Sequence, residues 1–202
     1  MIIMKNTRFR IFVRSILAGI CIGLGGAIFL KLGGVIGAVM FAFGLLAVVH
    51  FALPLYTGTA GFIKLNKFSE YWTMSLILIG NIIGCALLSL IVSNDININS
   101  LDATAIIQSR LDVGYLQSFL NAIGCGIIMT LIVQGGRDHN NLLILFGIPL
   151  FILLGFYHSI ADAFYMMCVD NNLRMEYLQY TYWIIVAGNF VGCNIPRLFK
   201  YK

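Results

Sequence analysis

The sequence GNIIGC at residues 80–85 recurs as GNFVGC at residues 188–193, at an offset of 108 residues. Both copies lie in apolar segments. In lipid, small residues four positions apart let two helix backbones approach closely, and asparagine can hydrogen-bond across them. The pattern therefore predicts helix packing at six positions and indicates that the chain contains a duplicated unit. These positions are Gly80, Asn81, Gly84, Gly188, Asn189 and Gly192.

The composition around these copies is that of a membrane protein. Of the 202 residues, 60% are hydrophobic and only 10% are charged, and the mean hydropathy is +0.93. This excludes an ordinary soluble domain and a disordered chain, so the lipid bilayer is the expected solvent. No Pro/Ser-rich linker interrupts the chain, and we expect a single transmembrane domain over residues 1–202. The basic N-terminus before an apolar run resembles a signal peptide, but the run continues to Leu30, so we expect an uncleaved first span.

The charges and cysteines argue against several other kinds of site. The net charge of +5 comes from basic residues dispersed at the ends of apolar segments, which does not favour a nucleic-acid partner. The five cysteines lie in apolar stretches without C-x-x-C spacing, so we expect no disulfide framework, metal site or cofactor.

Segments of roughly twenty apolar residues, the length that crosses a bilayer, predict six membrane-spanning helices. Gly33 and Gly34 indicate a tight first turn, and the polar stretch 93–112 is the longest connection. The predicted spans are 13–32, 34–56, 71–93, 115–134, 141–168 and 175–195.

The distribution of basic residues predicts the orientation. With a cytoplasmic N-terminus, ten basic residues fall inside and three outside, the latter being Lys31, Arg110 and Arg174. This obeys the positive-inside rule. We expect a multi-pass protein of the cell membrane with both termini cytoplasmic.

The duplication predicts two inverted halves, at about residues 10–93 and 115–197, because each half contains an odd number of spans. A transport site is then expected near the membrane midplane. How the halves align there is open. An offset of 108 places His50 opposite His158, whereas an offset of 103 places Leu55 opposite His158.

Ionisable residues inside the predicted fifth span are the strongest signal of function. His158 and Asp162 lie one helical turn apart, and an ionisable group at the centre of a membrane helix costs about 2.5–3.5 kcal/mol. A histidine that simply bonds a neighbouring helix is the alternative. The stretch 57–61, TGTAG, interrupts the second span, so we expect the second and fifth helices to be broken, with free helix ends lining a cavity.

Residues 155–162, GFYHSIAD, resemble the G-F-E-H-S-x-A-N signature of the formate/nitrite transporter family. Residues 55–58, LYTG, are similar to its L-F-T-G loop motif, residues 72–84 to its W-x-x-V-Y-x-G-N-x-x-G motif, and residues 18–26 to its glycine-rich opening helix. Tyr157 stands where the family has glutamate, Asp162 where it has asparagine, and Pro54 where an acidic residue is expected. Residues 58–72 are shorter than the family's gating loop, and the fourth span has Thr130 where the family commonly breaks at asparagine.

The resemblance implies an aquaporin-like fold of six helices, a homopentamer with one pore per protomer, a basic entrance, and apolar constrictions on both sides of His158. It implies a channel or transporter for small monovalent weak-acid anions, coupled to protons or gated by pH. Formate is the first choice, with nitrite, hydrosulfide, acetate and lactate as other candidates. The implied transport residues are Leu55, Thr57, Thr59, Thr130, Phe156, Tyr157, His158, Ser159 and Asp162.

Three alternative functions fit parts of the sequence. A neutral-solute channel resembling aquaporins also has six spans, but the sequence has no Asn-Pro-Ala pair. An intramembrane enzyme using Ser159, His158 and Asp162, or a metal site using His50 and His158, is disfavoured because adjacent side chains on one helix point apart. We therefore expect no enzyme. The short loop leaves a non-transporting membrane subunit as the third alternative.

Overall fold

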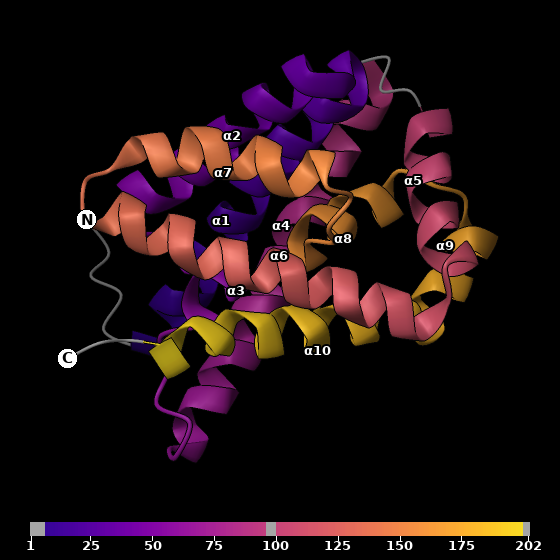
Figure 1. The fold of residues 1–202 in the computed structure, drawn as a ribbon. Helices are drawn as coiled ribbons and strands as arrows, with labels where there is room; N and C mark the ends of the chain where they lie inside the picture. The colour runs from indigo at the N-terminus through magenta and orange to yellow at the C-terminus, as the bar shows by residue number, and fades with distance from the viewer. Residues whose placement is uncertain (1–6, 96–99, 200–202) are drawn as a thin grey trace.

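The computed structural model describes residues 7–95 and 100–199, and within these residues the regular structure is helical throughout (Figure 1). The helices are α1 Thr7–Leu32, α2 Gly34–His50, α3 Tyr56–Ala60, α4 Phe68–Asp95, α5 Ser100–Asp112, α6 Gly114–Arg137, α7 Asn141–Leu153, α8 Ser159–Met167, α9 Asn171–Gln179, α10 Thr181–Asn194 and the 3₁₀ helix η1 Ile195–Phe199.

Among the described residues, three helices are long and apolar enough to cross a membrane, and they coincide with predicted spans. They are Thr7–Leu32, Phe68–Val92 and Gly114–Arg137. Two shorter apolar helices, α2 and α7, fall within the second and fifth predicted spans. The turn between α1 and α2 is as tight as predicted, because Gly33 and Gly34 both have positive φ angles, which residues with a β-carbon rarely adopt.

The interruption predicted at residues 57–61 lies a few residues earlier in the structure. The chain is non-helical after α2 from Phe51 to Leu55, and residues 57–60 belong to α3. Ala52 has a positive φ angle, and a residue that precedes proline, as Leu53 does here, is biased away from the helical conformation. These features end α2, and the chain becomes helical again only at Tyr56.

Two further elements differ from the predicted organisation. The polar stretch 93–112 contains α5, whose Ala103 and Ile107 lie one turn apart and are fully buried. The segment predicted as a continuous sixth span is divided at Tyr180, whose backbone angles (φ −143°, ψ −48°) separate α9 from α10. α9 carries Asn171, Asn172, Arg174 and Glu176, so it is much more polar than α10.

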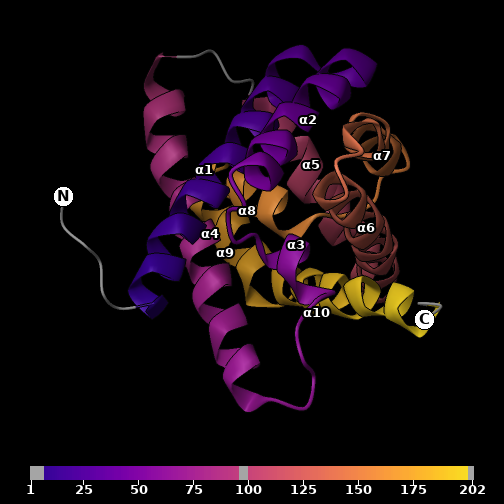
Figure 2. The same ribbon diagram turned by 90° about the vertical axis from the view of Figure 1, so that its left-hand side faces the viewer.

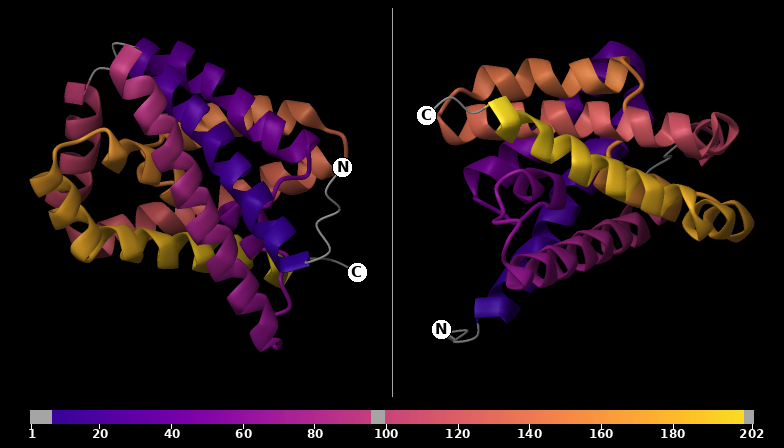
Figure 3. Two further views of the ribbon diagram at one scale, coloured as in Figure 1. Left: turned by 180° about the vertical axis from the view of Figure 1, so that it is seen from behind. Right: turned by 60° about the horizontal axis from the view of Figure 1, so that its bottom comes forward.

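The repeated glycines lie where long helices touch. α1 packs along α4, and α6 packs along α10 (Figures 2 and 3). A β-carbon added at Gly84 would meet the carbonyl oxygen of Ile16, and one added at Gly192 would meet the carbonyl oxygen of Ile123. Both helix pairs therefore depend on close approach of two backbones.

The short helices α3 and α8 lie in the middle of the assembly, surrounded by the longer ones (Figure 1). The start of α1 and the end of α10 lie at one end of the molecule, and α5 and α9 lie at the opposite end (Figures 1 and 3). α8 contacts α1, α4, α5 and α10. Residues at the beginnings of α3 and α8 are thus held inside the protein.

Candidate functional site

A hydrogen bond between Thr57 and His158 joins the two central short helices. Thr57 Oγ1 lies 2.8 Å from His158 Nε2, and both side chains are buried. The backbone N–H of Ala161 donates to His158 Nδ1 at 3.1 Å. A nitrogen that accepts this bond carries no hydrogen, so the pattern assigns the neutral tautomer with its proton on Nε2. His158 then donates to the Thr57 hydroxyl.

Two asparagines hold the extended residues that precede α3 and α8. Asn81 accepts from the Tyr56 N–H at 2.8 Å and donates to the carbonyl oxygens of Pro54 (3.0 Å) and Ser15 (2.8 Å). Both asparagine side chains are fully buried. Irregular backbone at membrane depth requires such partners, because lipid offers none.

Asn189 makes the corresponding three bonds in the second half of the chain. It accepts from the Ser159 N–H at 2.8 Å and donates to the carbonyl oxygens of Tyr157 (2.8 Å) and Ala122 (2.9 Å). Together, the asparagines connect α1 and α6 to the segments that position Leu55 and His158.

The matched bonds decide the alignment that the sequence left open. Tyr56 and Ser159 are bound by equivalent asparagines, and their positions differ by 103 residues. This offset places Leu55 opposite His158. His50 is exposed at the end of α2 and has no equivalent position in the pair of central segments.

Two cavities meet the central segments. The first, which we call the α3-side cavity, has a volume of about 330 Å³. The second, the α5-side cavity, has a volume of about 140 Å³. Among the residues lining the α3-side cavity are Pro54, Leu55, Gly58, Thr59, Thr73 and Arg137, and among those lining the α5-side cavity are Phe41, Arg110, Phe151, Phe156, His158 and Asp162.

A buried ion pair lies in the α5-side cavity. Arg110 Nε is 2.9 Å from Asp162 Oδ2, and the Tyr177 hydroxyl donates to the same oxygen at 2.7 Å. The Arg110 guanidinium also lies 4.3 Å from the centre of the Tyr157 ring, a cation–π geometry. Asp162 Oδ1 is buried and has no hydrogen-bond partner among the described residues.

Arg137, which lines the α3-side cavity, has a different environment from that of Arg110. Arg137 Nη2 donates to the Gly58 carbonyl at 3.0 Å, and its guanidinium lies 4.1 Å from the centre of the Phe62 ring. A neutral carbonyl and an aromatic face leave the positive charge of Arg137 uncompensated by these contacts. The two cavities therefore differ in charge.

The remaining predicted transport residues are not all gathered at this centre. Ser159 is buried beside His158, and its hydroxyl has no partner among the described residues. Thr130 lies apart, because its hydroxyl donates to the Cys193 carbonyl at 2.9 Å and it lines another cavity, between α6 and η1. α6 is continuous through Thr130, where the resemblance suggested a break.

The sequence interpretation treated Arg110 and Arg137 only as topology signals and did not single out Tyr177. A signal for Arg110 existed. It follows Ala103 and Ile107 at helical spacing, which places it on the buried face of α5. No local pattern identifies Arg110 as the partner of Asp162, which is 52 residues away.

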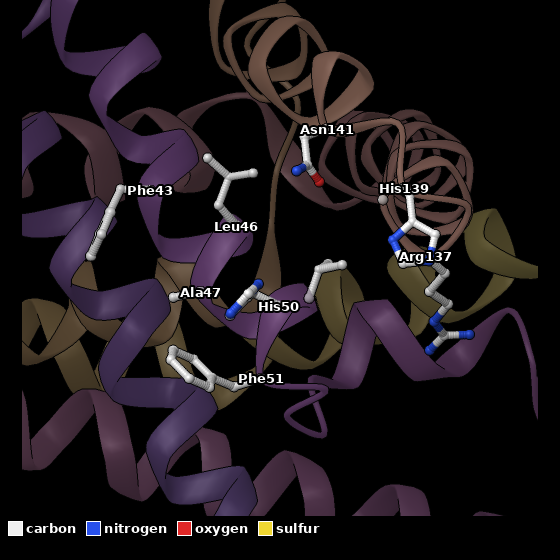
Figure 4. A pocket seen from close by; sticks show the side chains of 10 residues that line it. Phe43, Leu46, Ala47, His50, Phe51, Arg137, His139 and Asn141 are labelled. Atoms are coloured by element: carbon white, nitrogen blue, oxygen red, sulfur yellow. The ribbon is translucent and has the colours of Figure 1, made fainter.

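A larger cavity, of about 550 Å³, lies at the end of α2 beside the α6–α7 turn (Figure 4). It is lined by His50 and His139, and His158 is not among its lining residues. The structure therefore does not bring His50 and His158 to one cavity. Within residues 7–95 and 100–199, no three His, Cys, Asp or Glu side chains form a group that could hold a metal ion.

The arrangement expected of a hydrolytic triad is also not formed. His158 Nε2 bonds Thr57, whereas the Ser159 hydroxyl is unpartnered and Asp162 bonds Arg110 and Tyr177. A triad needs the histidine between the nucleophile and the carboxylate.

Comparisons with known proteins agree with this fold. The family described as Formate/nitrite transporter matches residues 3–197. The uncharacterized transporter YrhG of Bacillus subtilis (strain 168) is 26% identical over 181 residues, which cover 80% of this chain and 68% of that protein. A pentameric formate channel with formate bound shares the fold with a TM-score of 0.77 and 20% identity, over 98% of this chain and 97% of that chain. An FNT family ion channel also shares the fold, with a TM-score of 0.80 and 17% identity, over 98% of this chain and 92% of that chain. The family resemblance seen at residues 155–162 is therefore confirmed over nearly the whole chain. A transporter family also agrees with the expectation that the protein is not an enzyme. The protein belongs to the formate/nitrite transporter family.

Proposed function

We propose that this protein is a membrane channel for small monovalent weak-acid anions, with formate as the first candidate and nitrite, hydrosulfide, acetate and lactate as others. The observation that carries the proposal is the buried Thr57–His158 hydrogen bond, which joins the segments lining two cavities that each contain an arginine. The formate channel of the same fold supports the choice of formate.

The proposed architecture is one transmembrane channel domain over residues 1–202. Six crossings form two inverted repeats, at about residues 10–93 and 115–197, with α2 and α3 together as the second crossing and α7 and α8 as the fifth. The equivalent bonds of Asn81 and Asn189 support this arrangement. The excess of basic residues on one side favours the cell membrane with both termini cytoplasmic.

The proposed passage follows from the cost of dehydration. Apolar side chains, including Leu55 and Phe156, line the cavities beside Thr57 and His158. A bare anion loses much of its hydration there at a cost of several kcal/mol, on the order of that for other buried charges, whereas the neutral acid loses far less. The anion is therefore expected to cross the centre in its protonated form, with His158 and Thr57 as hydrogen-bonding partners.

We further propose a homopentamer with one pore in each protomer. Both cavities and the Thr57–His158 bond are formed within a single chain, so the pathway does not require a second copy. Exposed apolar side chains on α2 and α7 provide surfaces for lipid and for neighbouring protomers, among them Phe43 and Phe146. The pentameric assembly of the formate channel supports this proposal.

The test is uptake of labelled formate into liposomes that contain the purified protein, at a series of pH values. We expect saturable or channel-like flux that increases at acidic pH, and nitrite and hydrosulfide are included as competitors. His158→Asn should lower the flux and change its pH dependence. His50→Asn, the same substitution at a histidine that lines a different cavity, should do neither.

Two outcomes would contradict the proposal. Rapid water or glycerol flux without anion flux would favour a neutral-solute channel. Absence of any flux together with a stable protein partner would favour a non-transporting subunit. Unaltered rate and pH dependence in His158→Asn would remove the histidine from the mechanism while leaving the anion channel in place.

A further inference from the structure

Asp162 is one of the residues that line the α5-side cavity, and one of its carboxylate oxygens has no hydrogen-bond partner among the described residues. Its carboxylate is fully buried, and Oδ2 accepts from both Arg110 and Tyr177. Oδ1 accepts no hydrogen bond from any described residue. Buried polar atoms are nearly always satisfied, and an orphan oxygen therefore calls for a donor. Because Asp162 and His158 line the same cavity of about 140 Å³, a small molecule with an acidic hydrogen can supply that donor.

His158, by contrast, has both ring nitrogens engaged. Nδ1 accepts the Ala161 N–H at the first turn of α8, and Nε2 bonds Thr57. To take up a proton, Nδ1 would have to lose its bond to the backbone, and this would leave the Ala161 N–H unpaired in a buried place. His158 is thus held as a neutral hydrogen-bond donor, whereas Asp162 keeps one carboxylate oxygen, Oδ1, without a partner among the described residues.

We propose that Asp162 exchanges the proton with the permeating weak acid on the Arg110 side of His158. This rests on the proposed function and assigns its proton-coupling step. Arg110 is positioned to receive the anion, because Nη2 has no hydrogen bond among the described residues while Nε and Nη1 are used. The ligand recognised is a small carboxylate or similar oxyanion, held between a guanidinium and a carboxyl group.

The proton transfer from Asp162 to the anion needs no reactant other than a proton. The anion enters when Asp162 is protonated. The Oδ1–H bond breaks, a new O–H bond forms on the anion, and the neutral acid moves on past His158. The electron pair stays on Asp162, whose carboxylate is stabilised by Arg110 and Tyr177. A hydronium ion from the aqueous phase beside the cavity then restores the proton, so one anion and one proton cross together.

The groups around Asp162 define its electrostatic environment. Arg110 of α5 supplies the positive charge, and the other titratable groups near it are Cys125 of α6, His158 and Tyr165 of its own segment, Tyr177 of α9 and Tyr182 of α10. On α4, Cys85 donates to the Ile160 carbonyl, and α1 presents Gly23 and Gly26 to Phe164 and Tyr165. The proton-exchanging carboxyl is therefore surrounded by neutral groups and one cation.

Position 162 is asparagine in the pattern that this sequence resembles, and position 157 is glutamate. Here the acidic residue stands at 162 and Tyr157 lies against the Arg110 guanidinium. In this chain the carboxylate beside the cation therefore stands at position 162 and not at position 157. A double variant that moves it to position 157, Asp162→Asn with Tyr157→Glu, returns a carboxylate to the neighbourhood of Arg110.

The test combines flux with a direct measurement of the carboxyl group. Asp162→Asn should lower formate uptake at acidic pH by about 10²-fold, the lower range for loss of a positioned acid or base. The double variant should recover part of the rate. Asp170→Asn is the matched control, because Asp170 caps α9 at the surface and asparagine caps equally well.

Infrared difference spectra of the purified protein give the independent readout. The proposal requires a carboxylic-acid C=O band that appears on acidification, is missing in Asp162→Asn, and weakens when formate is added at the same pH. A wild-type rate in Asp162→Asn, or a missing or formate-insensitive band, would overturn it. If the wild type carries no formate, the proposed function fails, and the band still decides whether Asp162 exchanges protons with formate.

Discussion

The asparagines that hold the central segments give the most quantitative prediction. In Asn189→Ala, the Ser159 N–H and the Tyr157 carbonyl lose the hydrogen bonds that Asn189 provides. A buried group left unsatisfied costs about 1–3 kcal/mol, so two such groups cost roughly 2–6 kcal/mol. Hydrogen bonds in membrane proteins average near 0.6 kcal/mol, which favours the lower end. We therefore expect a loss of about 2 kcal/mol or more.

Thermal unfolding in detergent, followed by the loss of monodisperse protein, is a suitable assay. For a chain of this length, 1 kcal/mol corresponds to about 2–4 °C in soluble proteins, so the midpoint should fall by roughly 4–8 °C or more. Asn81→Ala should fall by a similar amount, because it loses the equivalent bonds to Tyr56 and Pro54.

Asn121→Ala serves as the control, because that side chain is only half-buried and accepts its single hydrogen bond from the exposed Gln117. Its midpoint should change little, since surface substitutions usually cost within about 0.5 kcal/mol. If Asn189→Ala unfolds at the same temperature as Asn121→Ala, the asparagine bonds do not hold the central segments.

Two further predictions concern the site and the helix contacts. Thr57→Val keeps the shape of the side chain but leaves His158 Nε2 without its partner, so we expect formate uptake to fall by about tenfold, equal to 1.4 kcal/mol. Thr73→Val should keep the wild-type rate, because the Thr73 hydroxyl lines the α3-side cavity but bonds only the Ser69 carbonyl of its own helix. Gly192→Leu forces side-chain atoms into a backbone carbonyl of α6, and overpacking of about 1–3 kcal/mol or more should abolish the folded peak in size-exclusion chromatography. Gly58→Ala should retain that peak, because the nearest atom to the added β-carbon would be 3.4 Å away. A folded Gly192→Leu variant would contradict the close contact between α6 and α10.

The sequence alone predicts the long elements well and the short ones less well. α1, α4 and α6 are found from apolar length, because a spanning helix of this kind is determined by its own residues. α5 was missed because its overall polarity hides one buried face of Ala103 and Ile107. The division between α9 and α10 at Tyr180 has no local sequence signal either, since the residues on both sides of it are helical.

The alignment of the two halves shows why sequence offsets mislead here. The copies containing Asn81 and Asn189 are 108 residues apart, but the segments they bind are 103 apart. Twenty-five residues separate Tyr56 from Asn81, and thirty separate Ser159 from Asn189. The second interval contains α9, so the extra residues are inserted between the site and its support. Only the hydrogen bonds reveal which residues correspond.

The α3-side and α5-side cavities differ in how the charge of their arginine is compensated. On the α3 side, Arg137 is bound to a neutral carbonyl and an aromatic ring. On the α5 side, Asp162 compensates the charge of Arg110 for as long as its carboxyl group is ionised, as in the ion pair. A cavity with an uncompensated charge concentrates anions, whereas a paired one does not. We therefore expect the apparent formate affinity to be higher from the α3 side than from the α5 side. Asp162→Asn uncovers Arg110 and should make the two affinities similar even while the rate of transport falls. Uptake measured from each side of oriented liposomes would show whether the α5-side affinity rises while the transport rate falls. A loss of both affinity and rate would instead mean that Asp162 only supports the fold.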